Sequence, residues 1–386
     1  MSTPAILTIF CRVVDNYGDI GVCWRLARSL AQRGVYQLHL WVDDLVSFQT
    51  ICPEISVNIQ QQCINQIVVH HWHDDADFTV AVSSRVLIEA FACELPASLQ
   101  AALALRWRET GQQAAWLNLE YLSAESWVED CHALCSVQAQ TGLRKYFFFP
   151  GFSEKTGGLL YESEVLASLS EFQQQPQAQQ DFLRKLGVVW RPEAQRISLF
   201  CYPPAPLLAL LGLAQKQNLA LQILLAEGVA SAQIEQFTGM RLRAGQRWQC
   251  GALSIECLPF ITQIDYDFLL ASCDANLVRG EDSFVRAQLV AKPMLWHIYP
   301  QQELAHIEKL TAFLQRYLAG IACSELRTEL EQLFLAWNAQ AELPESSWDL
   351  LLNQPVWTEM AQQWQRKITL NGDLSTRLLQ FIEKIG

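Results

Sequence analysis

Two aspartates near the start of the chain lie four residues apart in a short polar segment. The segment is VDNYGDIG, in which Asp15 and Asp19 flank Tyr17 and Gly18, and it directly follows an apolar run. A turn needs one Asp or Asn and one Gly, so a second carboxylate exceeds what a turn requires. Carboxylates repel phosphates, and their natural partner is a hydroxyl, ammonium or guanidinium that gives up a proton. We therefore interpret this segment as the acceptor side of a reaction, against the alternative that Asp19 only caps a helix.

A second polar segment, VRGEDSFVRAQ, also lies between a strand pattern and a helix pattern. Gly280 permits close approach of the backbone, and the N–H groups of Glu281, Asp282 and Ser283 would then begin a helix that can hold a diphosphate. The alternative is that Asp282 or Ser283 is simply an N-cap. Because one such loop occurs in each half of the chain, we favour a bound ligand over two simple N-caps. We place the substrate that donates the transferred group at this second loop.

Aromatic residues end another strand of the second half. Phe200 and Tyr202 in LFCYPP, if exposed, can stack on a nucleotide base, and Gln263 in LPFITQ can bond to the edge of that base. The alternative is that both rings belong to the core.

Other kinds of site find less support. In HHWHDD, His71 and His73 have the alternate spacing of metal ligands on a strand, but nothing completes the set, so we expect a strand end with solvated histidines from His70 onward. The sequence contains no Walker A motif, no G-x-G-x-x-G and no G-x-S-x-G. We predict no metal site.

The elements that position these residues alternate between strand and helix. We expect a buried strand over 5–13, a helix from Ile20 to Gly34 and a strand over 36–44, the opening of a Rossmann-like unit. The Gln-rich segment from Ser168 to Gly187 is the best candidate for a domain junction, although we expect its second half to form a helix, and a second alternating series follows it. These patterns predict an α/β fold with two doubly wound domains that face a cleft.

The length and composition of the chain agree with two folded domains of ordinary size. The chain has 386 residues, of which 51% are apolar, and a net charge of −12, which disfavours non-specific binding to nucleic acid. Its apolar runs are too short to span a membrane, and its first residues do not resemble a signal peptide. The twelve cysteines have no regular spacing, as expected of reduced thiols in the cytoplasm.

Three segments carry a resemblance to a known family. CRVVDNYGDIGVCWRLARSL, LPFITQIDYDFLL and especially VRGEDSFVRAQLVAKPMLWHIYPQ resemble the bacterial protein-arginine rhamnosyltransferases that modify elongation factor P. LNLEYLSAESWVED and FFFPGF also fit this family. The resemblance runs from the first strand to about His306 and implies a GT-B architecture of two Rossmann-like domains. We expect an N-terminal acceptor domain over 1–170, completed by the C-terminal helix 368–386, and a donor domain over 171–367.

The resemblance also implies an activity. The donor would be dTDP-β-L-rhamnose, transferred with inversion and without a metal or other cofactor to one arginine of elongation factor P, which is thereby activated to rescue ribosomes stalled at polyproline. The implied catalytic carboxylates are Asp15, Asp19 and Glu281. The implied donor contacts are Asn16, Tyr17, Gly18, Asp19, Phe200, Tyr202, Phe260, Gln263, Arg279, Gly280, Glu281, Asp282, Ser283 and Tyr299.

Two alternatives stay open at this point. One is a GT-B transferase that moves another sugar to a small molecule or lipid. The other is a non-catalytic sensor of nucleotide sugars, which has no need of the acceptor-side carboxylates.

Overall fold

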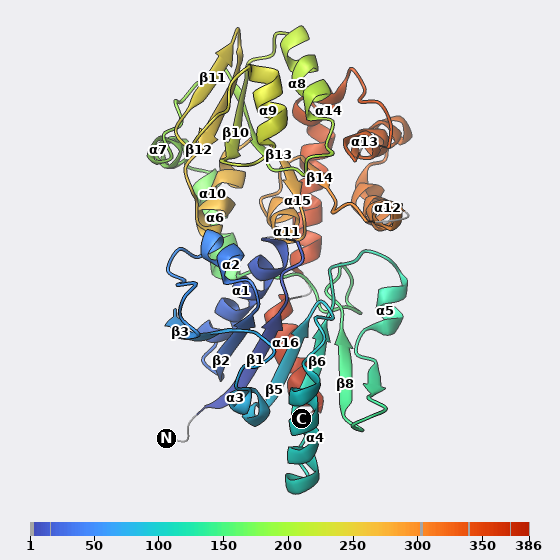
Figure 1. The fold of residues 1–386 in the computed structure, drawn as a ribbon. Coiled ribbons are helices and arrows are strands. Elements are labelled where there is room, and N and C mark those ends of the chain that lie inside the picture. Colours follow the sequence, from blue (N-terminus) through green and yellow to red (C-terminus); the bar gives the residue numbers. More distant parts are fainter. Residues whose placement is uncertain (1–3, 16, 302–303, 339, 371, 386) are drawn as a thin grey trace. The chain divides into compact units, whose positions relative to one another are not determined.

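The computed structural model describes residues 4–15, 17–301, 304–338, 340–370 and 372–385 (Figure 1). The chain forms two compact units: unit 1 comprises 1–162 and 368–386, and unit 2 comprises 163–367. The expected junction at 168–187 lies inside unit 2, where α6 (Ser163–Gln173) precedes α7 (Pro176–Lys185), the helix expected in the second half of that segment. The reason is aromatic packing, because Phe172 of α6 meets Phe268 edge-on with ring centroids 4.9 Å apart.

Unit 1 is built on a sheet with the order β3-β4-β2-β1-β5-β6-β8-β7. Its strands are β1 (Ala5–Cys11), β2 (Tyr36–Val42), β3 (Gln61–Ile64), β4 (Ile67–His71), β5 (Val86–Ala90), β6 (Ala115–Leu119), β7 (Cys135–Val137) and β8 (Arg144–Phe148). All neighbours pair in parallel except the edge strands β3 and β7. In the middle, Ile9 of β1 lies between Leu40 and Ile88, and β1 is buried from Leu7 to Cys11.

The helices of unit 1 come from both ends of the chain. They are α1 (Gly18–Gln32), α2 (Leu45–Ile51), α3 (Thr79–Ser83), α4 (Ala97–Thr110), α5 (Trp127–Cys131) and α16 (Leu374–Ile385). Asp373, just before α16, accepts two hydrogen bonds of 2.9 Å from the Nη2 atom of Arg33. Phe381 of α16 packs on Phe148 of β8, so the end of the chain is part of the unit 1 core.

Unit 2 repeats the design with a smaller sheet, in the order β11-β12-β10-β9-β13-β14. Its strands are β9 (Gln195–Leu199), β10 (Leu221–Ala226), β11 (Arg247–Cys250), β12 (Leu253–Leu258), β13 (Ala275–Arg279) and β14 (Met294–His297), with β11 as an antiparallel edge. Besides α6 and α7, its helices are α8 (Leu207–Lys216), α9 (Ser231–Thr238), α10 (Gln263–Ser272), α11 (Asp282–Leu289), α12 (Ala305–Tyr317), η2 (Leu318–Gly320), α13 (Ser324–Trp337), α14 (Ser347–Leu352) and α15 (Pro355–Thr369), the last of which crosses back into unit 1.

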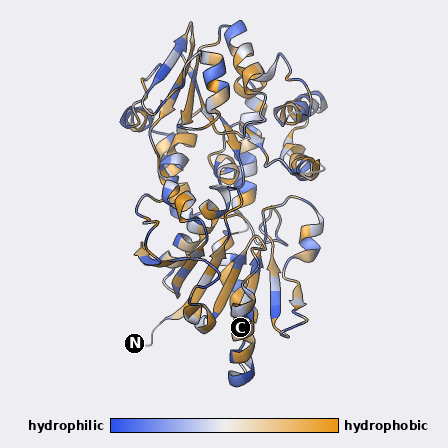
Figure 2. Cartoon of the chain, in the orientation of Figure 1, coloured by the Kyte–Doolittle hydropathy of each residue, from blue (hydrophilic) through white to orange (hydrophobic). Residues whose placement is uncertain are grey.

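Hydropathy follows this layering in each unit (Figure 2). The central strands are buried and largely apolar because helices cover them, as parallel sheets require, although single buried polar residues such as Thr8 and Glu89 occur in them. Polar residues concentrate on the outer faces of the helices. Over the residues described, no helix is both long and apolar enough to cross a membrane.

Candidate active site

In both sheets the first strand of the series lies in the interior. The chain adds strands on one side of β1 and then crosses to its other side at β5, and unit 2 does the same around β9 with β13. Where the order of strands in a parallel sheet reverses in this way, the loops after the two neighbouring strands turn to opposite faces of the sheet. The gap between these loops lies outside the carboxyl ends of the strands, and ligands bind there. The residues singled out in the sequence follow β1 in unit 1 and β9, β12, β13 and β14 in unit 2.

Asp19 is a buried carboxylate held by three donors. It lies in the first turn of α1 and is 1% exposed. Its Oδ2 atom accepts hydrogen bonds from the backbone N–H groups of Val14 (2.7 Å) and Asp15 (2.9 Å), and its Oδ1 atom accepts one from the Tyr121 hydroxyl (3.0 Å). The N-cap interpretation is therefore wrong, because these donors belong to the preceding loop and to Tyr121. Asp19 fixes the loop that carries Asp15.

Asp15 and Gly18 approach each other closely. The N–H group of Gly18 donates to the Asp15 carbonyl at 2.6 Å, and a Cβ atom on Gly18 would lie 2.8 Å from Oδ2 of Asp15. Any side chain at position 18 would therefore clash with the Asp15 carboxylate, which explains why a glycine stands there. The Asp15 side chain is half-buried and Tyr17 is exposed, whereas Asn16 lies outside the described residues.

Two aromatic residues lie beside Asp19 that are not among the predicted site residues. Tyr121, which follows β6, stacks on Phe91, which follows β5, with centroids 4.3 Å apart and planes 13° apart. Tyr121 also donates its hydroxyl to Asp19. Their position depends on strand order, which the sequence does not reveal: β5 pairs with β1 and so brings Phe91 to the carboxyl ends of the strands, next to the loop after β1.

In unit 2 the donor loop has the backbone expected of it. Gly280 adopts a left-handed conformation (φ 63°), and the indole N–H of Trp296 donates to its carbonyl at 2.9 Å. Helix α11 begins directly after Glu281, which occupies the N-cap position without a side-chain cap bond. The capping alternative therefore fails for Asp282 and Ser283, and the Ser283 hydroxyl instead bonds back to the Arg279 carbonyl.

Arg279 lies against both predicted aromatic residues. Its guanidinium carbon is 4.2 Å from the ring centroid of Phe200 and 4.6 Å from that of Tyr202. The expectation of an exposed pair is wrong for Tyr202, which is 6% exposed, while Phe200 is half-buried. Tyr202 is buried because its N–H group donates to His297 at 3.1 Å and its ring packs on His297 and Tyr299.

His297 remains a neutral acceptor in this arrangement. Burial lowers its pKa to about 4, and the positive charge of Arg279 acts in the same direction. A neutral imidazole can accept the hydrogen bond from Tyr202 through Nδ1, which fixes the loop after β9.

The remaining predicted residues lie at the same edge of the unit 2 sheet. The Gln263 amide donates to Asp282 at 3.2 Å, which joins the first turns of α10 and α11. Phe260 and Tyr299 follow β12 and β14, and both rings are exposed. Behind them, Arg286 and Asp267 form a fully buried bidentate pair with bonds of 2.9 and 2.7 Å that locks α11 to α10.

The histidine segment of unit 1 differs from expectation. His70 is buried, not solvated: it stacks on Trp41 with centroids 4.3 Å apart and bonds to His39 at 2.8 Å. His71 and His73 bond to the Asp43 carbonyl and to Gln60. Among the residues that the structure describes, no three His, Cys, Asp or Glu side chains are grouped to hold a metal ion.

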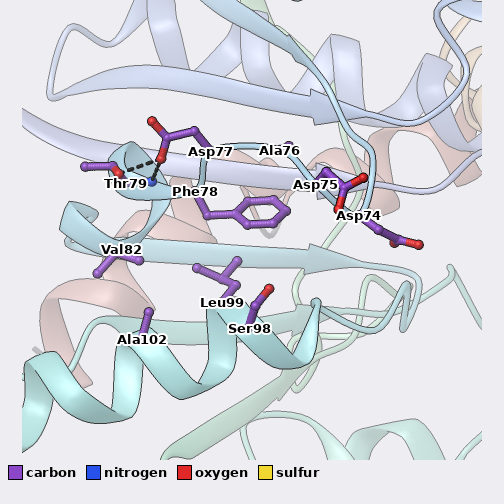
Figure 3. Close-up of a pocket in the computed structure, with 10 residues that line it drawn as sticks. All are labelled: Asp74, Asp75, Ala76, Asp77, Phe78, Thr79, Val82, Ser98, Leu99 and Ala102. Atoms are coloured by element: carbon purple, nitrogen blue, oxygen red, sulfur yellow. Dashed lines mark hydrogen bonds between the residues drawn. The ribbon is translucent and has the colours of Figure 1, made fainter.

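A separate hollow of about 530 Å³ lies in unit 1 between the segment after β4 and the helices α3 and α4 (Figure 3). Asp74, Asp75 and Asp77 line it with Phe78 and Leu99, and Asp77 is engaged by Thr79. None of the predicted site residues lines this hollow.

Comparisons with known proteins agree along the whole chain. The sequence model of the family described as elongation factor P (EF-P) rhamnosyltransferase EarP matches residues 7–383. The protein-arginine rhamnosyltransferases of Pseudomonas aeruginosa and Shewanella oneidensis are 44% and 40% identical to this chain, each over 97% of both proteins. A solved structure on EarP-mediated arginine glycosylation of translation elongation factor EF-P has a TM-score of 0.69 at 33% identity and covers 98% of this chain and 99% of its own. A glycosyltransferase from Rickettsia africae (TM-score 0.53, 8% identity, 100% and 99% covered) shares the fold alone.

Proposed function

The chain belongs to the EarP family of elongation factor P rhamnosyltransferases, and we propose that it moves L-rhamnose from dTDP-β-L-rhamnose to one arginine of elongation factor P. The family confirms the resemblance seen in the sequence, and with it the GT-B fold and a glycosyltransferase activity. The modified factor would then serve ribosomes stalled at polyproline. The observation that carries the proposal is the buried carboxylate of Asp19 at the carboxyl end of β1.

A guanidinium needs such a group. It is protonated at physiological pH and its lone pairs are delocalised, so it is a poor nucleophile. A carboxylate at a fixed position can orient the guanidinium and take a proton as the new bond forms. The two backbone donors occupy Oδ2 of Asp19, whereas among the residues that the structure describes Oδ1 accepts only the Tyr121 hydroxyl, so Oδ1 is the oxygen we assign to the proton.

The step is a single displacement. A guanidinium nitrogen forms a bond to the anomeric carbon from the side opposite to dTDP, and the bond from that carbon to the phosphate oxygen breaks. The nitrogen loses its proton to Asp19, and the configuration inverts. Asp15 would hold the rest of the guanidinium, and Glu281 would orient the sugar as the catalytic carboxylate of unit 2.

The departing diphosphate needs positive potential. The N-terminus of α11 and the Arg279 guanidinium supply it from the chain itself. We therefore propose that transfer proceeds without a metal.

We also propose that the protein acts in the cytoplasm. All twelve cysteines are free thiols, and several of them are exposed, among them Cys63 and Cys135. Such a set is typical of a reducing compartment.

The test is to incubate the protein with intact elongation factor P and dTDP-β-L-rhamnose and to measure the intact mass of the factor. We expect a gain of one deoxyhexose, which peptide fragmentation places on a single arginine. Parallel reactions with UDP-glucose and dTDP-glucose should give none. An unchanged mass with dTDP-rhamnose would refute the proposed acceptor or donor.

A further inference from the structure

The stacked rings of Phe91 and Tyr121 have no role in the chemistry described above. The stack is nearly parallel, with planes 13° apart, yet Tyr121 remains 38% exposed and Phe91 is half-buried. The hydroxyl at one end of this stack lies 3.0 Å from Oδ1 of Asp19. A flat, accessible aromatic surface therefore adjoins the oxygen assigned to the proton transfer.

The turn that presents Phe91 is strained and held in place. Phe91 has a φ of 56°, and Ala92 and Glu94 have φ values of 52° and 54°, a left-handed conformation that is uncommon for residues other than glycine. Such backbone persists only where its surroundings over-determine it, and it clusters at functional sites.

Three hydrogen bonds fix this turn. The N–H group of Phe91 donates to the Leu119 carbonyl (2.7 Å), that of Ala92 to the Asn118 side chain (3.1 Å) and that of Glu94 to Glu89 (2.9 Å). Asn118 and Glu89 are themselves 1% exposed. The ring of Phe91 is thus placed by buried polar groups.

We propose that the acceptor guanidinium stacks on the rings of Phe91 and Tyr121, and that the Tyr121 hydroxyl keeps Oδ1 of Asp19 turned toward this guanidinium. The inference rests on the proposed function, because it takes arginine as the acceptor. A guanidinium is planar and weakly hydrated, and it stacks on aromatic faces more readily than an ammonium does. Its edge can then reach the carboxylate beside the ring. Tyr121 is in these terms a positioning residue that acts on Asp19 and binds the acceptor.

The test separates the ring from the hydroxyl. We would measure kcat and the KM of each substrate for Tyr121→Leu, Phe91→Leu and Tyr121→Phe, with intact elongation factor P as the acceptor. The matched control is Tyr36→Phe, since Tyr36 is the first residue of β2 and so lies at the amino ends of the strands of the same sheet, away from Asp19. Thermal unfolding of each variant shows whether it is folded.

Loss of a ring should raise the KM for the acceptor by about 3- to 30-fold and leave the KM for dTDP-rhamnose within about twofold. Tyr121→Phe keeps the ring, so its acceptor KM should stay within about twofold of the original, while kcat falls about tenfold or more because a bond to a charged group is lost.

Two results would overturn the inference: an unchanged acceptor KM in Tyr121→Leu, or an unchanged kcat in Tyr121→Phe. Where Tyr121→Leu does not fold, Tyr121→Phe decides alone. Failure of the unmodified protein to glycosylate the factor would instead refute the proposed function, so the two failures are distinguishable.

Discussion

Replacement of Asp19 by Asn is the most direct test of the assigned base. The three hydrogen bonds of Asp19 can survive this change. The amide oxygen can accept from Val14 and Asp15 as Oδ2 does, and the amide N–H can donate to the Tyr121 oxygen, because a hydroxyl both donates and accepts. What disappears is the negative charge and the ability to take a proton.

The expected loss follows from that distinction. A positioned general base contributes roughly 10²- to 10⁴-fold to a rate. This range corresponds to about 3 to 5 kcal/mol in activation free energy, at about 1.36 kcal/mol for each factor of ten. We therefore expect kcat to fall at least about 100-fold. The affinity for dTDP-rhamnose should change little, since the diphosphate and base contacts are assigned to unit 2.

The assay combines turnover by intact mass with calorimetry of donor binding. Asp44→Asn is the matched control, because Asp44 also accepts from two backbone N–H groups, those of Val46 and Ser47, and from the Ser47 hydroxyl. Asp44 caps α2 and has no assigned role in the reaction. Near-normal turnover of Asp19→Asn would refute the assignment and transfer the role to Asp15 or Glu281.

Three further predictions concern the donor site and stability. Treatment with EDTA should leave turnover unchanged, and a loss that a divalent cation restores would contradict metal-free transfer. Asp267→Asn should lower the free energy of unfolding by about 3 to 5 kcal/mol, measured with urea, because it removes the negative charge that pairs with the buried Arg286 guanidinium; an effect below about 1 kcal/mol would contradict this. Burial lowers the pKa of His70, His132 and His297 to about 4. The unfolded chain binds these protons near pH 6.5, so the free energy of unfolding should fall as the pH drops from about 6.5 toward 4, and equal urea midpoints at about pH 7 and pH 5 would contradict it.

Much of the architecture was predictable because local patterns specify it. The strand expected over 5–13 is β1 (Ala5–Cys11), and the helix expected from Ile20 is α1, which begins two residues earlier at Gly18. In unit 2, we expect strands over RISLFCY, LALQILLAE, LSIECLPF, ANLVRG and MLWHIYP. The last four contain β10, β12, β13 and β14, and the first overlaps β9, which begins one residue earlier at Gln195. These elements have long apolar runs or clear helical spacing, which are the strongest signals in a single sequence.

Other elements gave weaker signals. The strand β5 is five residues long, and the buried Glu89 interrupts its apolar pattern. This carboxylate is stabilised by Lys145 at 3.2 Å and the Trp116 indole at 3.1 Å, which come from other strands. His70 was misjudged for the same reason, since its burial depends on Trp41 and His39 across the β2–β4 pair. A polar residue whose partners lie far away in sequence looks exposed.

The candidate site likewise has residues that local sequence patterns identify and residues that only contacts between distant segments bring together. Asp15, Asp19 and the Gly280–Ser283 segment follow their strands directly, so residue type and position were enough to propose them. Phe91 and Tyr121 lie 72 and 102 residues beyond Asp19 and meet it only because β5 pairs with β1 and β6 pairs with β5.

The order of strands explains why we assign the chemistry to these loops in particular. Around β1 the chain first builds outward through β2 and β4, then returns to the other side at β5, so the loops after β1 and β5 diverge to opposite faces of the sheet. The divergence leaves the carboxyl ends of both strands uncovered by a crossover, and a buried carboxylate and an aromatic pair can meet there without displacing a helix. Unit 2 repeats this arrangement at β9 and β13, where Phe200 and Tyr202 meet Arg279. The two units thus place opposite chemistries, carboxylate in one and guanidinium in the other, at equivalent positions. That division is what a transferase with a cationic acceptor and an anionic donor requires.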